Sequence, residues 1–156
     1  MAIIKADDIS KTFRVYKRGD GFKGYLKSFV SREYEEVKAV EDLNLEIEKG
    51  EMIGYIGSNG AGKSTTVKML TGILEPSSGT IEVNGLNPSK QRKKNAMNIG
   101  VVFGQKTQLW WDLPVKESFK LLKEIYEVKD EEYEKRIEKF DEVLQLSDFW
   151  DQPVRK

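Results

Sequence analysis

The sequence predicts an α/β fold, with a β-rich first part and a helical last part, on three observations. Residues 2–16 and 37–50 partly alternate polar and apolar side chains, which is typical of antiparallel strands. A short apolar run over 51–57 leads through a glycine-rich loop into a helix-like pattern over 62–74. From about residue 107 onward the apolar residues keep a helical spacing.

Several shorter elements complete the first part. Residues 17–36, an aromatic and basic stretch between the two alternating strands, are expected to be an insertion. "EMIGYIG" (51–57) and "NIGVVFGQ" (98–105) are apolar enough to predict strands buried on both faces, as in a parallel sheet. "EPSSGTIEVNG" (75–85) predicts a turn, a brief strand and an Asn-Gly turn.

Three helices are expected from apolar spacing. In the first, which follows the glycine-rich loop, one face carries Val67, Leu70 and Leu74. The second and third are expected to start near Pro114 and Asp130, since proline suits a first helical position and acids suit a first turn. Their apolar faces comprise Val115, Phe119, Leu122 and Tyr126, and then Tyr133, Ile137, Phe140 and Leu144. The change of character predicts a subdomain boundary between 1–106 and 107–156.

Composition excludes several kinds of function. The 156 residues contain 26 basic and 26 acidic side chains, so no overall charge attracts nucleic acid, and no nucleic-acid partner is expected. Cysteine and histidine are both absent, which excludes disulfides, thiolate metal sites and a histidine base. No apolar run approaches the roughly 20 residues that span a bilayer, so we expect a soluble, cytoplasmic chain.

The glycine-rich loop carries the most specific motif. Gly57, Gly62, Lys63 and Ser64 match G-x-x-x-x-G-K-[ST], between a predicted strand and a predicted helix as the motif requires. The first N–H groups of a helix lack partners within the helix, and the helix dipole adds positive charge there. Glycines at 57, 60 and 62 allow the chain to turn successive amides inward. The motif therefore predicts a nucleotide triphosphate site.

The loop residues have distinct expected roles. Lys63 is expected to bridge the β- and γ-phosphates as a point charge, and the Ser64 hydroxyl to hold Mg²⁺. The remaining phosphate oxygens would accept from backbone amides along the loop. The predicted ATP-binding residues here are Gly57, Ser58, Asn59, Gly60, Ala61, Gly62, Lys63, Ser64 and Thr65.

Several separated segments resemble the nucleotide-binding domain of ABC transporters. They are "ISKTF", "AVEDLNLEIEKGEMIGYIG", "GSNGAGKSTTVKMLTGILEPSSGTIEVNG" and "IGVVFGQ". The resemblance implies a P-loop NTPase (RecA-like) core with an N-terminal antiparallel β subdomain and the start of a helical subdomain. Within the family, "GVVFGQKTQLWWDLPVKESFKLLK" and the insertion look most like ABC-2-type exporters of drugs and antibiotics.

The resemblance also assigns residues outside the loop. Gln105 matches the Q-loop glutamine, whose amide would contact Mg²⁺ or orient water. Phe13 matches the aromatic residue that stacks on adenine, although Tyr16 lies three residues on and either ring fits. Trp110 and Trp111 follow the Q-loop, where the family's ATPases receive a helix of the membrane subunit; one or both could instead lie in the core.

Other parts of the family's pattern are missing. No four-residue apolar run ends in Asp-Glu, and there is neither a signature motif nor a switch histidine. We therefore expect an incomplete ABC ATPase domain, an N-terminal fragment that binds ATP without hydrolysing it at a useful rate. The parent would be an ATPase of the cell membrane's inner face, working with a transmembrane permease and a second ATPase domain.

Two other classes also contain a P-loop. One is a soluble ABC ATPase of translation or DNA repair, which would usually carry tandem domains or long inserts. The other is a P-loop kinase, which would need an arginine-rich lid, and residues 107–156 contain nothing like one.

Overall fold

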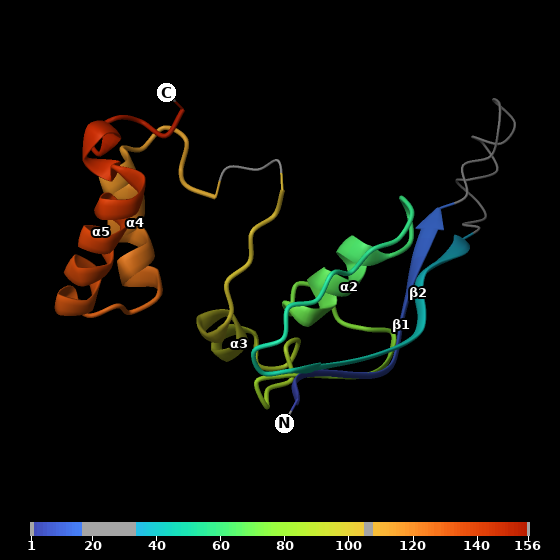
Figure 1. The fold of residues 1–156 in the computed structure, drawn as a ribbon. Helices are drawn as coiled ribbons and strands as arrows, with labels where there is room; N and C mark the ends of the chain where they lie inside the picture. The colour runs from blue at the N-terminus through green and yellow to red at the C-terminus, as the bar shows by residue number, and fades with distance from the viewer. Residues whose placement is uncertain (1, 17–33, 105–107, 156) are drawn as a thin grey trace, which may run out of the picture. The chain divides into compact units, whose positions relative to one another are not determined.

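The computed structural model describes residues 2–16, 34–104 and 108–155, drawn as a ribbon in Figure 1. The chain forms two compact units, Met1–Gly100 and Val101–Lys156, and each is described by itself. No helix within the described ranges is long and apolar enough to cross a membrane.

The first unit is built on a three-stranded sheet in the order β2-β1-β3. Strands β1 (Ala2–Tyr16), β2 (Tyr34–Glu48) and β3 (Ser78–Val83) pair antiparallel, which confirms the predicted strands and their direction. Strand β3 pairs with β1 only between Ile4 and Ser10. The outer part of the β1–β2 hairpin is therefore two-stranded. The predicted Asn-Gly turn follows β3, with positive φ at both residues.

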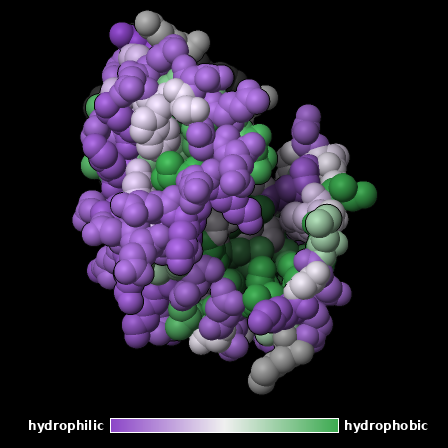
Figure 2. All heavy atoms as spheres, turned by 60° about the vertical axis from the view of Figure 1, so that its left-hand side comes forward, coloured by the Kyte–Doolittle hydropathy of each residue, from purple (hydrophilic) through white to green (hydrophobic). Residues whose placement is uncertain are grey.

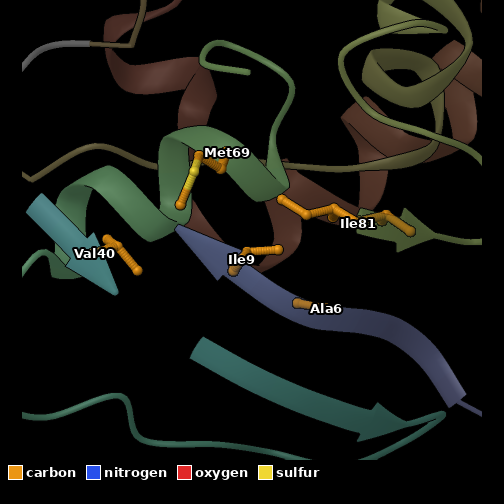
Figure 3. Close-up of a cluster of buried hydrophobic side chains, with 6 residues drawn as sticks. Ala6, Ile9, Val40, Met69 and Ile81 are labelled. Carbon is orange, nitrogen blue, oxygen red and sulfur yellow. The ribbon is translucent and has the colours of Figure 1, made fainter. Parts of the chain in front are cut away.

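Helix α2 (Lys63–Leu70) covers one face of this sheet (Figure 3). Met69 of α2 is buried among apolar side chains of all three strands, and apolar burial of this kind is the main source of folding free energy. The strand members of this cluster are Ala6, Ile9, Val40, Ile81 and Val83. Leu70 and Leu74 of the predicted helix face pack against this cluster, whereas Val67 is exposed, and Thr66 and Met69 are the fully buried residues of α2.

The two predicted parallel strands are wrong. Residues 51–57 and 99–103 have no strand structure, and Met52, Ile56 and Val102 are 100%, 91% and 82% exposed. A strand buried on both faces needs a hydrogen-bonded neighbour on each side. None of the three described strands pairs with either apolar segment, so neither segment has such neighbours among the described residues.

A short helix, α3 (Arg92–Asn98), was not predicted from the sequence. Its stretch is polar and basic, and only one of its residues, Asn95, is buried. The asparagine side chain is 0% exposed, and neither its Oδ1 nor its Nδ2 has a hydrogen-bond partner among the residues that the structure describes. A polar group in this state lowers stability.

The second unit is a pair of helices, α4 (Val115–Ile125) and α5 (Asp130–Leu144), followed by a 3₁₀ turn, η1 (Leu146–Phe149). The start of α5 agrees with the prediction, and α4 begins one residue after Pro114, which is its N-cap. The Phe119 ring of α4 contacts α5 and the residue after η1: its centroid lies 6.2 Å from that of Phe140 and 5.6 Å from that of Trp150.

The segment after η1 closes the second unit by pairing with the segment before α4. Val154 N–H donates to the Leu113 carbonyl and Arg155 N–H to the Trp111 carbonyl, both at 3.1 Å. Lys116 forms an ion pair with Asp151 in the same region. Trp110 and Trp111 are 43% and 64% exposed, so neither lies in a core. Figure 2 shows a face of the molecule that is mostly hydrophilic, with hydrophobic residues exposed in places.

Candidate nucleotide-binding site

The glycine-rich loop ends at the first turn of α2, which presents unpaired backbone donors. Gly62 is the N-cap of α2, and the first intrahelical bond runs from Thr66 N–H to its carbonyl at 2.8 Å. No described residue accepts a hydrogen bond from the N–H groups of Gly62, Lys63, Ser64 or Thr65. These amides, with the positive end of the helix dipole, form an anion site.

The side chain of Lys63 folds back across the same loop. Its Nζ donates to the carbonyl oxygens of Gly57 and Ser58, each at 2.6 Å. The ammonium group therefore lies beside the unpaired amides and adds a full positive charge to their partial charges. Such a combination suits a polyphosphate, which carries several negative charges close together.

The three loop glycines are not equivalent. Gly60 and Gly62 have φ of +86° and +78°, a region that other residues rarely adopt, whereas Gly57 does not. A Cβ on Gly57 would meet the Ala61 Cβ at 3.4 Å, an ordinary contact. The expectation that all three glycines supply special backbone angles is therefore correct at 60 and 62 and wrong at 57.

Gly62 is also where β2 touches the loop. A Cβ built on Gly62 would lie 2.2 Å from the Ala39 carbonyl oxygen and 2.9 Å from the Val40 Cγ2. The β1–β2 register shifts between Lys11 and Thr12, which leaves Ala39 as an extra residue on β2. This bulge brings the Ala39 backbone against the loop, a contact that the sequence pattern did not predict.

Two further features surround the loop. The Tyr55 hydroxyl and the Thr66 Oγ1 lie 3.4 Å apart, which links the segment before the loop to the buried face of α2. A hollow of about 320 Å³ beside the loop is lined by Gly60, Ala61, Tyr55 and β2 side chains that include Lys38. The hollow lies along β2 and reaches the loop at Gly60 and Ala61.

The structure distinguishes the two candidate aromatic rings. Residues 13 and 16 lie on opposite faces of β1, because strand side chains alternate. Tyr16 stacks against Tyr34 with ring centroids 4.6 Å apart and accepts a hydrogen bond from the Tyr34 hydroxyl. Phe13 lies on the same face of β1 as Lys11, whose Nζ donates a hydrogen bond to the Glu75 carbonyl in the segment after α2. Phe13 is therefore on the face that carries α2.

Of the two expected metal ligands, the structure describes one. Ser64 is exposed in the first turn of α2, where its hydroxyl is available to a bound ion. Gln105 lies outside the described residues. Within the described ranges no group of three or more acidic side chains is placed to hold a metal by itself. A hydroxyl beside unpaired amides fits an ion that arrives with a phosphate, since Mg²⁺ is usually held by few protein ligands plus phosphate oxygens.

A loop that matches G-x-x-x-x-G-K-[ST], with unpaired amides at a helix N-terminus and a lysine folded across it, is characteristic of P-loop nucleotide-binding proteins, although the segment before the loop, 51–57, has no strand structure here. Comparison with known families narrows this class. Residues 40–156 match the family model described as "ABC transporter". The chain belongs to the ABC transporter family.

Named relatives agree with the family. Over 118 residues the chain is 39% identical to the ABC transporter ATP-binding protein NatA of Bacillus subtilis, covering 76% of this chain and 48% of NatA. It is 37% identical to the methionine import ATP-binding protein MetN of Geobacillus kaustophilus, covering 71% of this chain and 33% of that protein. The chain thus spans about half, or less, of the length of these relatives.

Solved structures show the same fold. CbiO1 of Clostridium perfringens, described as part of the ABC transporter complex cbiONQ, superimposes with a TM-score of 0.66 at 26% identity. An ATP-binding subunit of an ABC transporter gives a TM-score of 0.74 at 24% identity, a likeness of fold alone. Each match covers 97% of this chain and 54% of the other.

Proposed function

We propose that this chain supplies the ATP-binding half of an ABC transporter's nucleotide-binding subunit. The observation that carries the proposal is the geometry of Lys63, whose ammonium lies within the loop beside four unpaired amides. Phosphates of ATP would replace the two carbonyls as partners of the ammonium. The proposed ATP-binding residues are those of the loop from Gly57 to Thr65, with Phe13 stacking on the adenine.

Mg²⁺ belongs to the same proposal. The Ser64 hydroxyl would hold the ion together with phosphate oxygens, and Gln105 would contribute from the segment after 103. When bound, the ion would neutralise phosphate charge and orient the γ-phosphate. The chain's own contribution is binding and orientation, through the amides of α2 and the Lys63 ammonium.

Lys63→Ala tests the proposal directly. Displacement of a fluorescent ATP analogue by ATP should show at least a ten-fold weaker affinity in this variant, because the phosphates lose a full charge. Lys68→Ala is the matched control, since Lys68 lies in the last turn of the same helix, away from the loop. Equal affinity of Lys63→Ala and the wild type would refute the site.

The role of the whole protein follows from the relatives. We propose that ATP binding and hydrolysis in the complete subunit drive transport through a membrane permease, at the inner face of the membrane and as a pair of ATPase domains. The cbiONQ complex, of which CbiO1 is a part, supports a multi-subunit assembly of this kind. The named relatives include import proteins, so export of the ABC-2 type is supported only by the sequence segments quoted above.

The assignment of 1–106 to the β subdomain and loop, and of 107–156 to the start of a helical subdomain, is part of this proposal. So is the lack of hydrolysis in the 156-residue chain, which contains no histidine and no apolar run ending in Asp-Glu. Steady phosphate release by the purified chain that Lys63→Ala abolishes would contradict this expectation.

A further inference from the structure

The strand residues just before Phe13 are tied to the segment that follows α2. Ser77 N–H donates to the Ser10 carbonyl at 2.8 Å, and Thr12 N–H donates to the Ser77 Oγ at 3.1 Å. These bonds continue the edge of β1 beyond the point where β3 stops pairing with it. The chain leaving the loop helix is therefore fixed against β1 at Ser10 and Thr12.

Lys11 lies between these two residues and makes a third link. Its Nζ donates to the Glu75 carbonyl at 2.7 Å. The same Nζ lies over the Phe13 ring, 5.5 Å from the ring centroid. A single ammonium group thus contacts both the segment after the loop helix and the ring proposed to stack on adenine.

From this geometry we infer that Lys11 is a positioning residue for nucleotide binding, one that orients the Phe13 ring to receive a purine base. An ammonium over a ring is attracted by the negative face of the π system. The Glu75 carbonyl fixes the ammonium, so the attraction also restricts the ring. Because the cation covers one face of the ring, the inference requires the base to stack on the opposite face.

This inference rests on the proposed function, since it needs a base that stacks on Phe13. A ring held in place loses less conformational freedom when a base stacks on it, so the base binds more tightly. The effect should concern the base alone. Inorganic tripolyphosphate, which has no base, should bind the loop equally well with and without the Lys11 charge.

Lys11→Met removes the charge and keeps an unbranched side chain. We expect its affinity for ATP to fall about two- to five-fold, the size of an exposed cation–π contact, with no change for tripolyphosphate. Lys5→Met is the matched control on the same strand, because Lys5 pairs with Asp7 and contacts neither Phe13 nor Glu75. Lys11→Arg, which keeps the charge, should bind ATP like the wild type.

The measurement is displacement of a fluorescent ATP analogue from the full chain, by ATP and by tripolyphosphate in parallel. Phe13→Ala should weaken ATP alone, and Lys11→Met in the Phe13→Ala background should weaken it no further. An equal loss for both ligands in Lys11→Met, or an additional loss in the double variant, would overturn the inference. So would unchanged binding in Lys11→Met.

The proposed function fails by a different result. If Phe13→Ala leaves the ratio of ATP to tripolyphosphate affinity unchanged, the base does not stack on Phe13 and the adenine site is wrong. If Lys63→Ala binds both ligands like the wild type, the phosphate site itself is wrong. A loss in Phe13→Ala without one in Lys11→Met contradicts the role of Lys11 alone.

Discussion

Replacing Asn95 by leucine should stabilise the first unit. The Asn95 side chain is completely buried in α3, and its two polar atoms have no hydrogen-bond partner among the described residues. Burying a polar group unpaired costs about 1–3 kcal/mol. Leucine removes this cost, and its greater bulk offsets part of the gain through overpacking. We expect a net gain of about 1–2 kcal/mol in the free energy of unfolding.

Urea unfolding followed by circular dichroism measures this gain. With a slope of about 1–1.5 kcal/mol per molar urea for a unit of this size, the midpoint should rise by about 1 M. Asn98→Leu is the control, because Asn98 lies in the same helix and is exposed. The control raises helix propensity and removes no buried polar group, only the exposed hydrogen bond from the Asn98 Nδ2 to the Lys94 carbonyl. A lower midpoint in Asn95→Leu, or an equal rise in both variants, would refute the reasoning.

Three other perturbations have expected outcomes. Gly62→Ala should weaken both ATP binding and thermal stability, because its Cβ would collide with the Ala39 carbonyl at a φ of +78°. Gly57→Ala, with no such collision, is the control for thermal stability, and an equal loss of stability in the two variants would contradict the contact between Gly62 and Ala39. Phe119→Ala should destabilise the second unit by roughly 2–3 kcal/mol in chemical unfolding, since the ring contacts Phe140 and Trp150; a loss below about 0.5 kcal/mol would count against these contacts. The pKa of Lys116 is raised above its ordinary value of 10.5 by the hydrogen bond to Asp151 and by that carboxylate's charge, so the pair's contribution is complete below pH 10.5 and is lost above it. Thermal melts at about pH 9 and pH 11.5 should show a smaller alkaline decrease in Lys116→Met than in the wild type, and an equal decrease in both would be the contrary result.

The parts of the fold that depend on local pattern could be predicted. The start of α5 at Asp130 and the antiparallel pairing of β1 with β2 follow from spacing and alternation. The Asn84-Gly85 turn after β3 follows from the few residues that tolerate positive φ. The start of α5 and the Asn84-Gly85 turn are determined by residues close together in the chain, whereas alternation predicted β1 and β2 as strands without their register.

The parts of the fold that depend on distant partners could not be predicted from the sequence. An apolar segment such as 51–57 becomes a strand only when other strands supply hydrogen-bond partners, and apolar content alone does not provide them. Helix α3 escaped prediction because its polar and basic stretch has a single buried side chain, so no apolar periodicity marks it.

The candidate site divides in the same way: the part that depends on a local motif could be predicted, and the part that depends on distant contacts could not. The motif predicted the loop from Gly57 to Thr65, because phosphate binding imposes a fixed spacing on it. The sequence left Phe13 and Tyr16 both open as candidate rings for adenine, and the strand geometry shows only that the two rings lie on opposite faces of β1. No sequence signal identified Lys11, since one of its two contacts is with a carbonyl 64 residues further along the chain.

The extra residue at Ala39 separates two requirements on the same hairpin. At Ala39 itself, the backbone of β2 is constrained by its contact with Gly62. Beyond Ala39, toward the far end of the hairpin, β1 and β2 pair in a separate register, from Thr12 with Lys38 to Tyr16 with Tyr34. Segments of different length could therefore be grafted at the far end of the hairpin without altering how β2 meets the glycine-rich turn. Relatives with short and long hairpins could share one phosphate-binding geometry for this reason.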